Sequence, residues 1–266
     1  MAAKIDSLTI LSEDVYALGR FYEAFFHMRP VDAAGGAAPV RLSDGNMRIH
    51  IEPRLTGAPA ELHTFAIAVD DIAAAVDRMR ARDAAVEVLD APAGQPQGAV
   101  AAHDPAGNIF VLTQRRGENG ESGGGRTHDR VIDHFGLRVR DPGRIADFYA
   151  EAFGLRPAEG PKGNGNIYLT DGRATMVITP WRMSDFEDTG ITARGMDHIG
   201  FRVESIAALK ADMDRVTERN PRFRPANTVV GRGKEGAGRL AMFQRTCPLG
   251  RHHMADSDGL LLDVTE

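Results

Sequence analysis

The chain has 266 residues, of which 42% are hydrophobic and 26% are charged, so it is long enough to bury a sizeable core. Its formal net charge of −5 provides no basic surface for nucleic acid, and no apolar run approaches the roughly 20 residues of a membrane span. A single cysteine excludes an internal disulfide and the N-terminus carries no apolar signal core, so we expect a cytoplasmic protein without nucleic-acid or membrane partners.

The sequence repeats itself with an offset of 127 residues. Segment 21–30 reads Phe-Tyr-Glu-Ala-Phe-Phe-His-Met-Arg-Pro, and segment 148–157 reads Phe-Tyr-Ala-Glu-Ala-Phe-Gly-Leu-Arg-Pro. The same offset aligns several positions of segment 42–53 with segment 169–180. An ungapped match over about fifty positions indicates an internal duplication.

The repeat divides the chain into an N-terminal domain, residues 1–114, and a C-terminal domain, residues 131–266. The intervening residues 115–130 are rich in glycine and polar side chains and have no hydrophobic period. This composition predicts a flexible linker.

Each half contains two similar modules. Segment 62–74 resembles segment 196–208, and the Asp-x-x-Gly sequence at 104–107 resembles the one at 256–259. Each module begins with a short strand and continues into a helix, as at Asp141-Pro142, where Asp is a good N-cap and Pro fits the first helical position. Two or three short strands close each module. The pattern predicts an α+β fold of four βαβββ modules.

The four modules, the Phe-Tyr…Phe-Gly-Leu-Arg-Pro segment and the closing Asp-x-x-Gly strand together resemble the vicinal oxygen chelate superfamily. That group includes glyoxalase I, the bleomycin-resistance proteins and the extradiol ring-cleaving dioxygenases. The resemblance covers nearly the whole chain outside the linker. It implies a glyoxalase-like fold in which the modules pair into two half-open mixed β-barrels around pockets that often hold a divalent metal. By resemblance alone, a homodimer is also expected.

Two histidines occupy equivalent positions in the third and fourth modules. In segments 135–139 and 199–203 every second residue is apolar and is expected to pack under a helix, so His134 and His198 face the pocket. Each histidine follows an aspartate and precedes an x-Gly step that leaves room. The pattern therefore places two imidazoles on the concave side of the C-terminal domain.

A third candidate ligand is Asp263, a carboxylate in an otherwise apolar closing strand, where it needs a partner. Two histidines and one carboxylate suit Fe(II), with Mn(II) or Zn(II) as alternatives. The other interpretation is that the histidines are hydrogen-bonded pocket residues and that Asp263 pairs with an arginine, such as Arg138 or Arg202. The family resemblance implies that these three positions are metal ligands, although the family usually has Glu at the third.

The N-terminal domain lacks this set, because Ser7, Thr64 and Val111 stand at the matching positions. His50 aligns with Val177, a position where glyoxalase-type members can carry an acid, and we interpret it as structural. The first half is therefore expected to be a scaffold.

Ten residues before Asp263, where extradiol dioxygenases tend to carry a tyrosine that acts on the substrate hydroxyl, this chain has His253. Histidine performs acid–base catalysis near neutral pH, so His253 is the catalytic candidate. Tyr168, Trp181 and His252 are the candidate substrate-binding residues. The alternative interpretation is a pair of loop histidines and two core aromatics.

Residues 231–236 read Gly-Arg-Gly-Lys-Glu-Gly and fit G-x-G-x-x-G. They are predicted to form a loop before a strand rather than a turn between a strand and a helix, which argues against a dinucleotide site.

Three functions are compatible with these patterns. The first is a metal-dependent dioxygenase of the extradiol type, acting on a small aromatic diol or a related oxygenated compound. The second is a glyoxalase- or epimerase-like enzyme, which usually needs a further acid ligand at the place of Val177. The third is a non-enzymatic small-molecule binder, like drug-sequestering members of the superfamily, which needs a pocket but no metal.

Overall fold

The computed structural model describes residues 3–31, 40–54, 61–92, 95–114, 129–182, 195–225, 234–246 and 249–266, with the side chains of 234–236 left out. It confirms the α+β prediction: two mixed sheets, neither of them closed, carry five α-helices in the described residues. Among those residues, no helix is long and apolar enough to cross a membrane.

The first half forms an eight-stranded sheet with the order β2-β3-β4-β1-β5-β8-β7-β6. Its elements are β1 (Lys4–Ser12), α1 (Val15–Phe26), β2 (Arg29–Pro30), β3 (Val40–Ser43), β4 (Arg48–Pro53), β5 (Glu61–Val69), α2 (Ile72–Arg82), β6 (Val88–Asp90), β7 (Val100–His103) and β8 (Ile109–Gln114).

The second half forms a seven-stranded sheet with the order β10-β11-β12-β9-β13-β15-β14. Its elements are β9 (Val131–Val139), α3 (Pro142–Phe153), β10 (Arg156–Pro157), β11 (Ile167–Thr170), β12 (Thr175–Pro180), β13 (Gly195–Arg202), α4 (Ile206–Arg219), the 3₁₀ turn η2 (Pro221–Phe223), α5 (Lys234–Thr246), β14 (His252–Ala255) and β15 (Leu261–Thr265).

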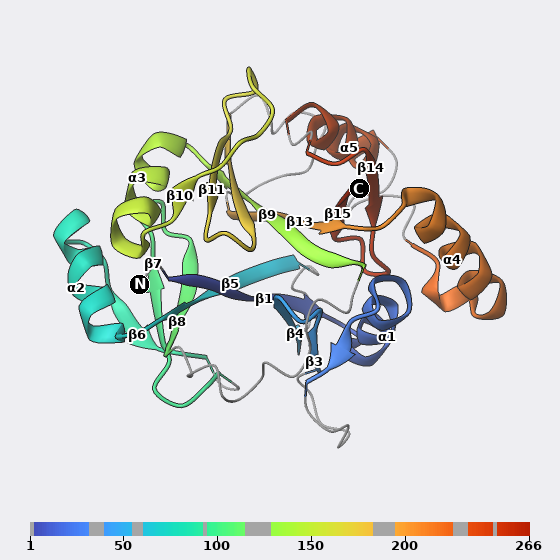
Figure 1. The fold of residues 1–266 in the computed structure, drawn as a ribbon, viewed down its shortest axis with the longest axis horizontal. Helices are drawn as coiled ribbons and strands as arrows, with labels where there is room; N and C mark the ends of the chain where they lie inside the picture. The colour runs from blue at the N-terminus through green and yellow to red at the C-terminus, as the bar shows by residue number, and fades with distance from the viewer. Residues whose placement is uncertain are drawn as a thin grey trace.

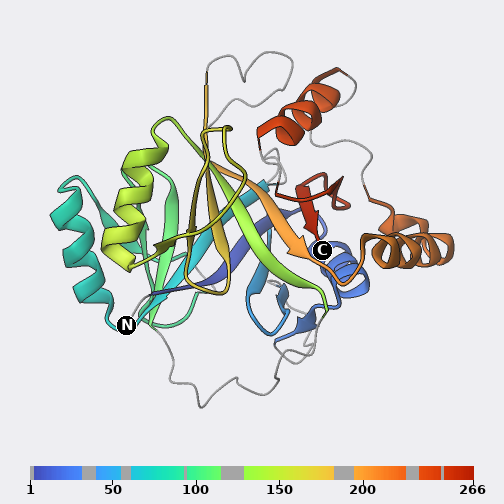
Figure 2. The same cartoon turned by 45° about the horizontal axis from the view of Figure 1, so that its top comes forward.

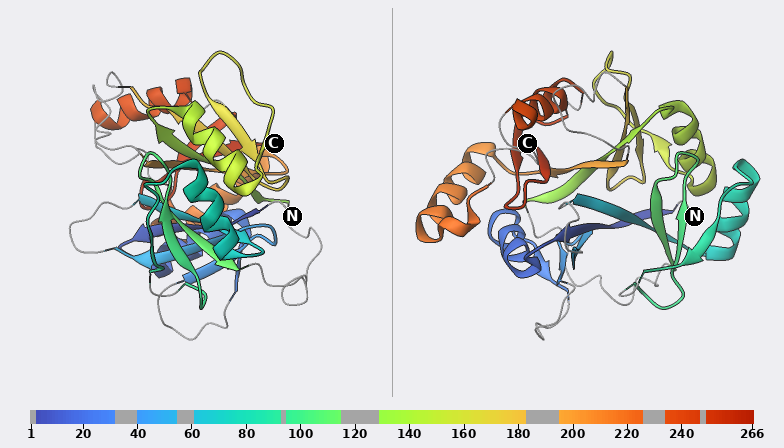
Figure 3. Two further views of the ribbon diagram at one scale, coloured as in Figure 1. Left: turned by 90° about the vertical axis from the view of Figure 1, so that its left-hand side faces the viewer. Right: turned by 180° about the vertical axis from the view of Figure 1, so that it is seen from behind.

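The two sheets lie one above the other, and helices cover both sides of the sandwich (Figures 1 and 3). Helices α2 and α3 lie together at one side, and α1 and α4 lie together at the other (Figure 1). Short polar side chains open the first four helices by accepting a hydrogen bond from a backbone N–H of the first turn, as N-caps do. These N-caps are Asp14, Asp71, Asp141 and Ser205.

One hydrophobic core runs through both halves. Phe65 of β5 packs against Phe135 of β9 with ring centroids 5.1 Å apart, and Phe26 of α1 packs on Phe201 of β13 at 3.8 Å. The alternation correctly separated these apolar residues from the histidines, but they pack against the opposite half of the chain rather than only under the helix of their own module. Burial of these aromatic side chains contributes strongly to the interaction between the halves.

Turn carboxylates that the internal repeat aligns bind the backbone of the opposite half. Asp44 Oδ2 accepts a hydrogen bond from the N–H of Ile132 at 2.6 Å, and Asp171 Oδ2 accepts one from the N–H of Ile5 at 2.9 Å. Both carboxylates are buried. They satisfy the backbone donors at the start of the other half's first strand.

A second pair of crossed hydrogen bonds joins the helices of one half to the closing turns of the other. The Tyr22 hydroxyl donates to Asp256 at 2.9 Å, and the Tyr149 hydroxyl donates to Asp104 at 3.2 Å. Several of the residues that reveal the duplication therefore also connect the two halves of the chain.

The predicted linker, residues 115–130, falls outside the described residues except for Asp129 and Arg130, so the domain boundaries stay a prediction. Arg130 is buried, and its guanidinium donates to the Phe25 carbonyl and to the carboxylates of Glu204 and Asp212. This end of the segment is therefore fixed by contacts to both halves.

The fourth module departs from the βαβββ prediction within the described residues. Residues 234–246 form helix α5, where we predicted a loop and a strand and where the second module has β6. Residues 239–246 contain several good helix formers, and the adjacent Met242 and Phe243 are buried. Residues 231–233 of the G-x-G-x-x-G segment lie outside the described residues.

Candidate metal centre

Three neighbouring strands of the second sheet bring the candidate ligands together. His134 lies on β9, His198 on β13 and Asp263 on β15, and each is fully buried. One nitrogen or oxygen atom from each residue lies within 4.8 Å of those of the other two. The strand alternation read from the sequence therefore places the three side chains on one face, around a common point.

The register of the strands explains this convergence. Gly200 of β13 is the register partner of both His134 and Asp263, and His253 of β14 pairs with Asp263. These residues form one row across four strands, and Gly200 contributes no side chain to that row. His198 precedes Gly200 by two residues and therefore points to the same face.

Glycines create the space that the ligands occupy, in a crossed arrangement. A Cβ at Gly200 would overlap the His134 ring, and a Cβ at Gly136 would overlap the His198 ring. A Cβ at Gly250 would overlap the Asp263 carboxylate. The sequence indicated that the x-Gly steps leave room, but not that each glycine accommodates the histidine of the neighbouring strand.

Asp263 contacts histidines and backbone in the described residues. Its Oδ2 accepts hydrogen bonds from His134 Nε2 at 3.1 Å and from the N–H of Gly250 at 2.8 Å, whereas its Oδ1 is buried without a hydrogen bond. Burial alone raises the pKa of Asp263, but the hydrogen bond from His134 and the interactions with His253 and His198 outweigh it and lower that pKa. The side chain is therefore a buried carboxylate whose Oδ1 faces the His253 ring without forming a hydrogen bond.

The donor set fits a divalent cation. Two imidazoles and one carboxylate, with a buried oxygen that lacks a hydrogen-bond partner, suit Fe(II), Mn(II) or Zn(II). A cation held by these three residues would take the place of the His134–Asp263 hydrogen bond.

The alternative pairing of Asp263 with Arg138 is not what the structure shows. Arg138 instead donates to Asp197, from Nε to Oδ1 at 2.6 Å and from Nη2 to Oδ2 at 3.1 Å. Asp197 Oδ2 also lies 2.8 Å from His198 Nδ1. Although burial raises the pKa of Asp197, the Arg138 charge and the His198 hydrogen bond lower it well below its usual range. Sequence reasoning noted that an aspartate precedes each histidine but gave neither aspartate a role.

His253, the catalytic candidate, lies beside the centre. Its Nε2 is 3.2 Å from Asp263 Oδ1, and its side chain is 13% exposed to solvent. The Phe243 ring of α5 packs edge-on against both His198 and His253, with centroids 4.8 and 5.2 Å apart. Helix α5, which lies on the same side of the molecule as β14 and β15 in Figures 1 and 2, thus contacts the centre through Phe243, and the sequence did not predict this helix.

The candidate substrate-binding residues lie outside this cluster. Tyr168 is buried, and its hydroxyl interacts with Asn164, Asn166 and the Pro161 carbonyl. Trp181 is buried against Met242 of α5. His252 pairs with Val264, so strand alternation turns it to the opposite face of β14 from His253. Burial, with the nearby Lys210 and His253, lowers the pKa of His252.

The first half has no such cluster among its described residues. Ser7 and Thr64 are buried at the places of the two histidines, and Val111 is buried at the place of the acid. His50 is also buried, on β4.

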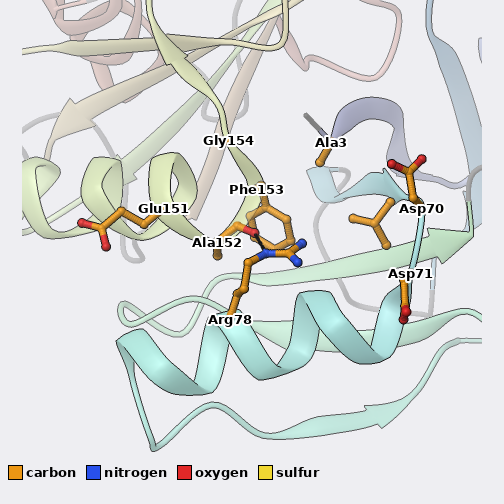
Figure 4. Close-up of a pocket in the computed structure, with 9 residues that line it drawn as sticks. Ala3, Asp70, Asp71, Arg78, Glu151, Ala152, Phe153 and Gly154 are labelled. Carbon is orange, nitrogen blue, oxygen red and sulfur yellow. Dashed lines mark hydrogen bonds between the residues drawn. The ribbon is translucent and has the colours of Figure 1, made fainter. Parts of the chain in front are cut away.

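A separate surface hollow of about 450 Å³ lies near the N-terminus, between α2 and α3 (Figure 4). Asp70, Asp71 and Glu151 line it, together with Arg78, whose Nε donates to the Ala152 carbonyl at 2.8 Å. The hollow lies at the opposite side of the sandwich from α5 and β14 (Figure 1). It is therefore distinct from the cluster of candidate ligands.

Comparison with known proteins identifies a family and a set of solved structures. A family model described as the Glyoxalase/Bleomycin resistance protein/Dioxygenase superfamily matches residues 4–112 and 131–264. No curated protein sequence gives a significant match.

The solved structures share the architecture at low sequence identity. Homoprotocatechuate 2,3-dioxygenase from Arthrobacter globiformis is 14% identical with a TM-score of 0.63, over 100% of this chain and 80% of that one. The Mn(II)-bound glyoxalase from Novosphingobium aromaticivorans is 14% identical with a TM-score of 0.60, over 99% and 81%. A catechol 2,3-dioxygenase is 16% identical with a TM-score of 0.61, over 99% and 87%. At these identities the likeness establishes the fold alone.

Proposed function

Because the chain belongs to the glyoxalase/bleomycin resistance protein/dioxygenase superfamily, we propose that it is a metal-dependent dioxygenase of the extradiol ring-cleaving type. Its substrate would be a small aromatic diol or a related oxygenated compound. The observation that carries this proposal is the convergence of His134, His198 and Asp263 to within 4.8 Å on one face of the second sheet. Two solved structures with this architecture are named as a homoprotocatechuate 2,3-dioxygenase and a catechol 2,3-dioxygenase.

His134, His198 and Asp263 would hold the cation, and Fe(II) is the ion best suited to oxygen chemistry on two histidines and one carboxylate. The ion would supply Lewis acidity and a template for two neighbouring substrate oxygens. The chain's own residues keep the site dry, because all three ligands and the Phe243 ring are buried. A low-polarity site strengthens the electrostatic interactions within it.

His253 would move the proton. It is partly exposed, lies 3.2 Å from Asp263 Oδ1 and can therefore reach a hydroxyl group placed beside the ion. A neutral imidazole nitrogen can accept the proton of a phenol and return it later. Phe243 restricts the orientation of this ring through an edge-on contact.

A glyoxalase- or epimerase-like reaction is the rival. It usually needs a further acid ligand, and the place where the family can carry one is taken by Val177, which is buried and pairs with Gly136. One solved structure of this architecture is named as a Mn(II)-bound glyoxalase. Oxygen consumption during turnover separates the two reactions.

The test combines metal content with oxygen uptake. Protein purified without oxygen and loaded with Fe(II) is expected to hold one ion per chain and to consume oxygen with at least one member of a catechol panel. H134A and D263A are expected to lose the ion, because each removes one of three ligands. H50A in the first half is the matched control and is expected to keep it.

The H253N variant is expected to keep the ion and to lose roughly 10²- to 10⁴-fold in kcat, the usual contribution of a general acid–base group. Absence of stoichiometric iron or manganese in the wild type, with unchanged metal content in H134A, would refute the proposed function. Turnover of a carbonyl substrate without oxygen uptake would favour the rival.

A further inference from the structure

A buried ion pair lies directly behind His198. The Asp197 carboxylate accepts from His198 Nδ1 at 2.8 Å and from Arg138 Nε at 2.6 Å. The side chains of Arg138 and Asp197 are only 2% and 6% exposed. This contact places the imidazole proton on Nδ1, so the Nε2 lone pair is the one that can face an ion.

The other histidine is held less firmly. Asp133 Oδ2 lies 3.4 Å from His134 Nδ1, and the Asp133 side chain is 32% exposed. A longer contact to a carboxylate that reaches water restricts the ring less than a short, buried one. The two ligand histidines therefore differ in support, although their sequences match.

The ion pair also reaches helix α5. Arg138 Nη2 donates to the hydroxyl of Thr246, the last residue of α5, at 3.2 Å. The Thr246 carbonyl accepts a hydrogen bond from the side chain of Asn166 at 2.7 Å. One turn earlier in α5, Phe243 packs on the His198 ring. His198 is thus connected to α5 both directly and through Asp197 and Arg138.

We propose that Asp197 and Arg138 are positioning residues, which fix His198 for the ion and couple ion binding to the docking of helix α5. The inference rests on the metal site of the proposed function. An ion that binds better when His198 is held by this network must also stabilise the network, because coupling between two sites is reciprocal. Ion binding is therefore expected to hold α5 more firmly against the sheet.

The first test measures Zn(II) affinity by competition with a chromophoric chelator, without any turnover. D197N is expected to weaken Zn(II) binding by about 10- to 100-fold, the range found when an outer partner of a ligand histidine is removed. The matched control is D133N, which removes the corresponding aspartate behind His134 and is expected to weaken binding less. Circular dichroism checks that both variants are folded.

The second test uses Trp181, the only tryptophan in the chain, which packs against Met242 of α5. Zn(II) is expected to change the Trp181 emission of the wild type as α5 becomes more firmly docked. T246V removes the hydroxyl that accepts from Arg138 and should reduce this change, whereas T246S should restore it. This variant keeps the buried ion pair and so avoids the unfolding that D197N risks.

These measurements decide whether Asp197 and Arg138 position His198 and whether ion binding is coupled to helix α5. Equal Zn(II) affinity of D197N and D133N overturns the positioning role, and an emission that does not respond to Zn(II) overturns the coupling to α5. A wild type that binds no Zn(II) overturns this inference and the proposed metal site together. Normal Zn(II) binding with no oxygen uptake in the iron-loaded protein removes the dioxygenase proposal and leaves this inference intact.

Discussion

Replacing Asp256 by asparagine is expected to remove a large part of the pH dependence of the protein's stability. Asp256 is fully buried between the halves, where its Oδ2 accepts from the Tyr22 hydroxyl and its Oδ1 from the backbone N–H groups of Asp258 and Leu260. Burial, only partly opposed by these hydrogen bonds, raises the pKa of Asp256 from 3.8 to about 7.

The sign and size of the effect follow from this shift. Because the pKa of Asp256 is higher in the folded than in the unfolded protein, its contribution is most favourable below pH 3.8 and is lost as the pH rises to about 7. Each pH unit in this window lowers the free energy of unfolding by about 1.4 kcal/mol. Between pH 5 and pH 8 the wild type therefore loses roughly 3 kcal/mol through this group.

An asparagine has nearly the same shape and no charge. Its oxygen can accept from the two backbone N–H groups, and its amide can turn to the Tyr22 oxygen. Urea unfolding of wild type and D256N at pH 5 and pH 8, followed by circular dichroism with a chelator present, gives the measurement. The stability of D256N relative to wild type should increase by roughly 3 kcal/mol between these pH values.

The equivalent site in the first half is the control. Asp104 also has a raised pKa because of burial, but the side-chain amide of Asn108 donates to it at 2.7 Å and opposes the shift. D104N is therefore expected to show a smaller change between pH 5 and pH 8. A D256N difference that is constant with pH, or that grows toward low pH, would refute the reasoning.

Three further predictions follow from the packing. G200A should push the His134 ring aside, abolish Zn(II) binding and lower the free energy of unfolding by about 1–3 kcal/mol; unchanged affinity in a chelator competition would contradict it. R130M removes a buried guanidinium from two carboxylates that partly reach solvent, and it should cost about 1–3 kcal/mol in urea unfolding; a loss within error would contradict it. L260N places a side-chain amide donor near Asp256 and should therefore lower the Asp256 pKa. In urea unfolding, L260N should lose less stability between pH 5 and pH 8 than the wild type does.

The ligand cluster could be predicted from sequence because it depends on local patterns. The duplication placed His134 and His198 at equivalent positions, and the two-residue period of a strand gave the face of each side chain. Asp263 stood out as a carboxylate in an apolar strand. None of these steps needed the partner of any residue to be known.

The features that were missed depend on partners far away in the chain. Arg138 contacts Asp197 and Thr246, which lie 59 and 108 positions later. Tyr22 and Asp256 are separated by 234 positions. A repeat shows that such residues are equivalent to others, but it does not reveal what they touch.

Helix α5 was missed for a different reason. Its start overlaps the glycine-rich segment 231–236, which resembles a loop, and the modular repeat favoured a strand in its place. The buried pair Met242 and Phe243 decides the outcome, because the helix covers apolar surface beside the centre.

The crossed glycines have a consequence for engineering. Thr9 and Ala66 of the first half stand where the second half has Gly136 and Gly200. Transplanting two histidines and an aspartate onto Ser7, Thr64 and Val111 alone would crowd the new rings against these two side chains. A second centre at these described positions would also require glycines in place of Thr9 and Ala66, so this part of the first half differs from the second in the space beside the ligands as well as in the ligands themselves.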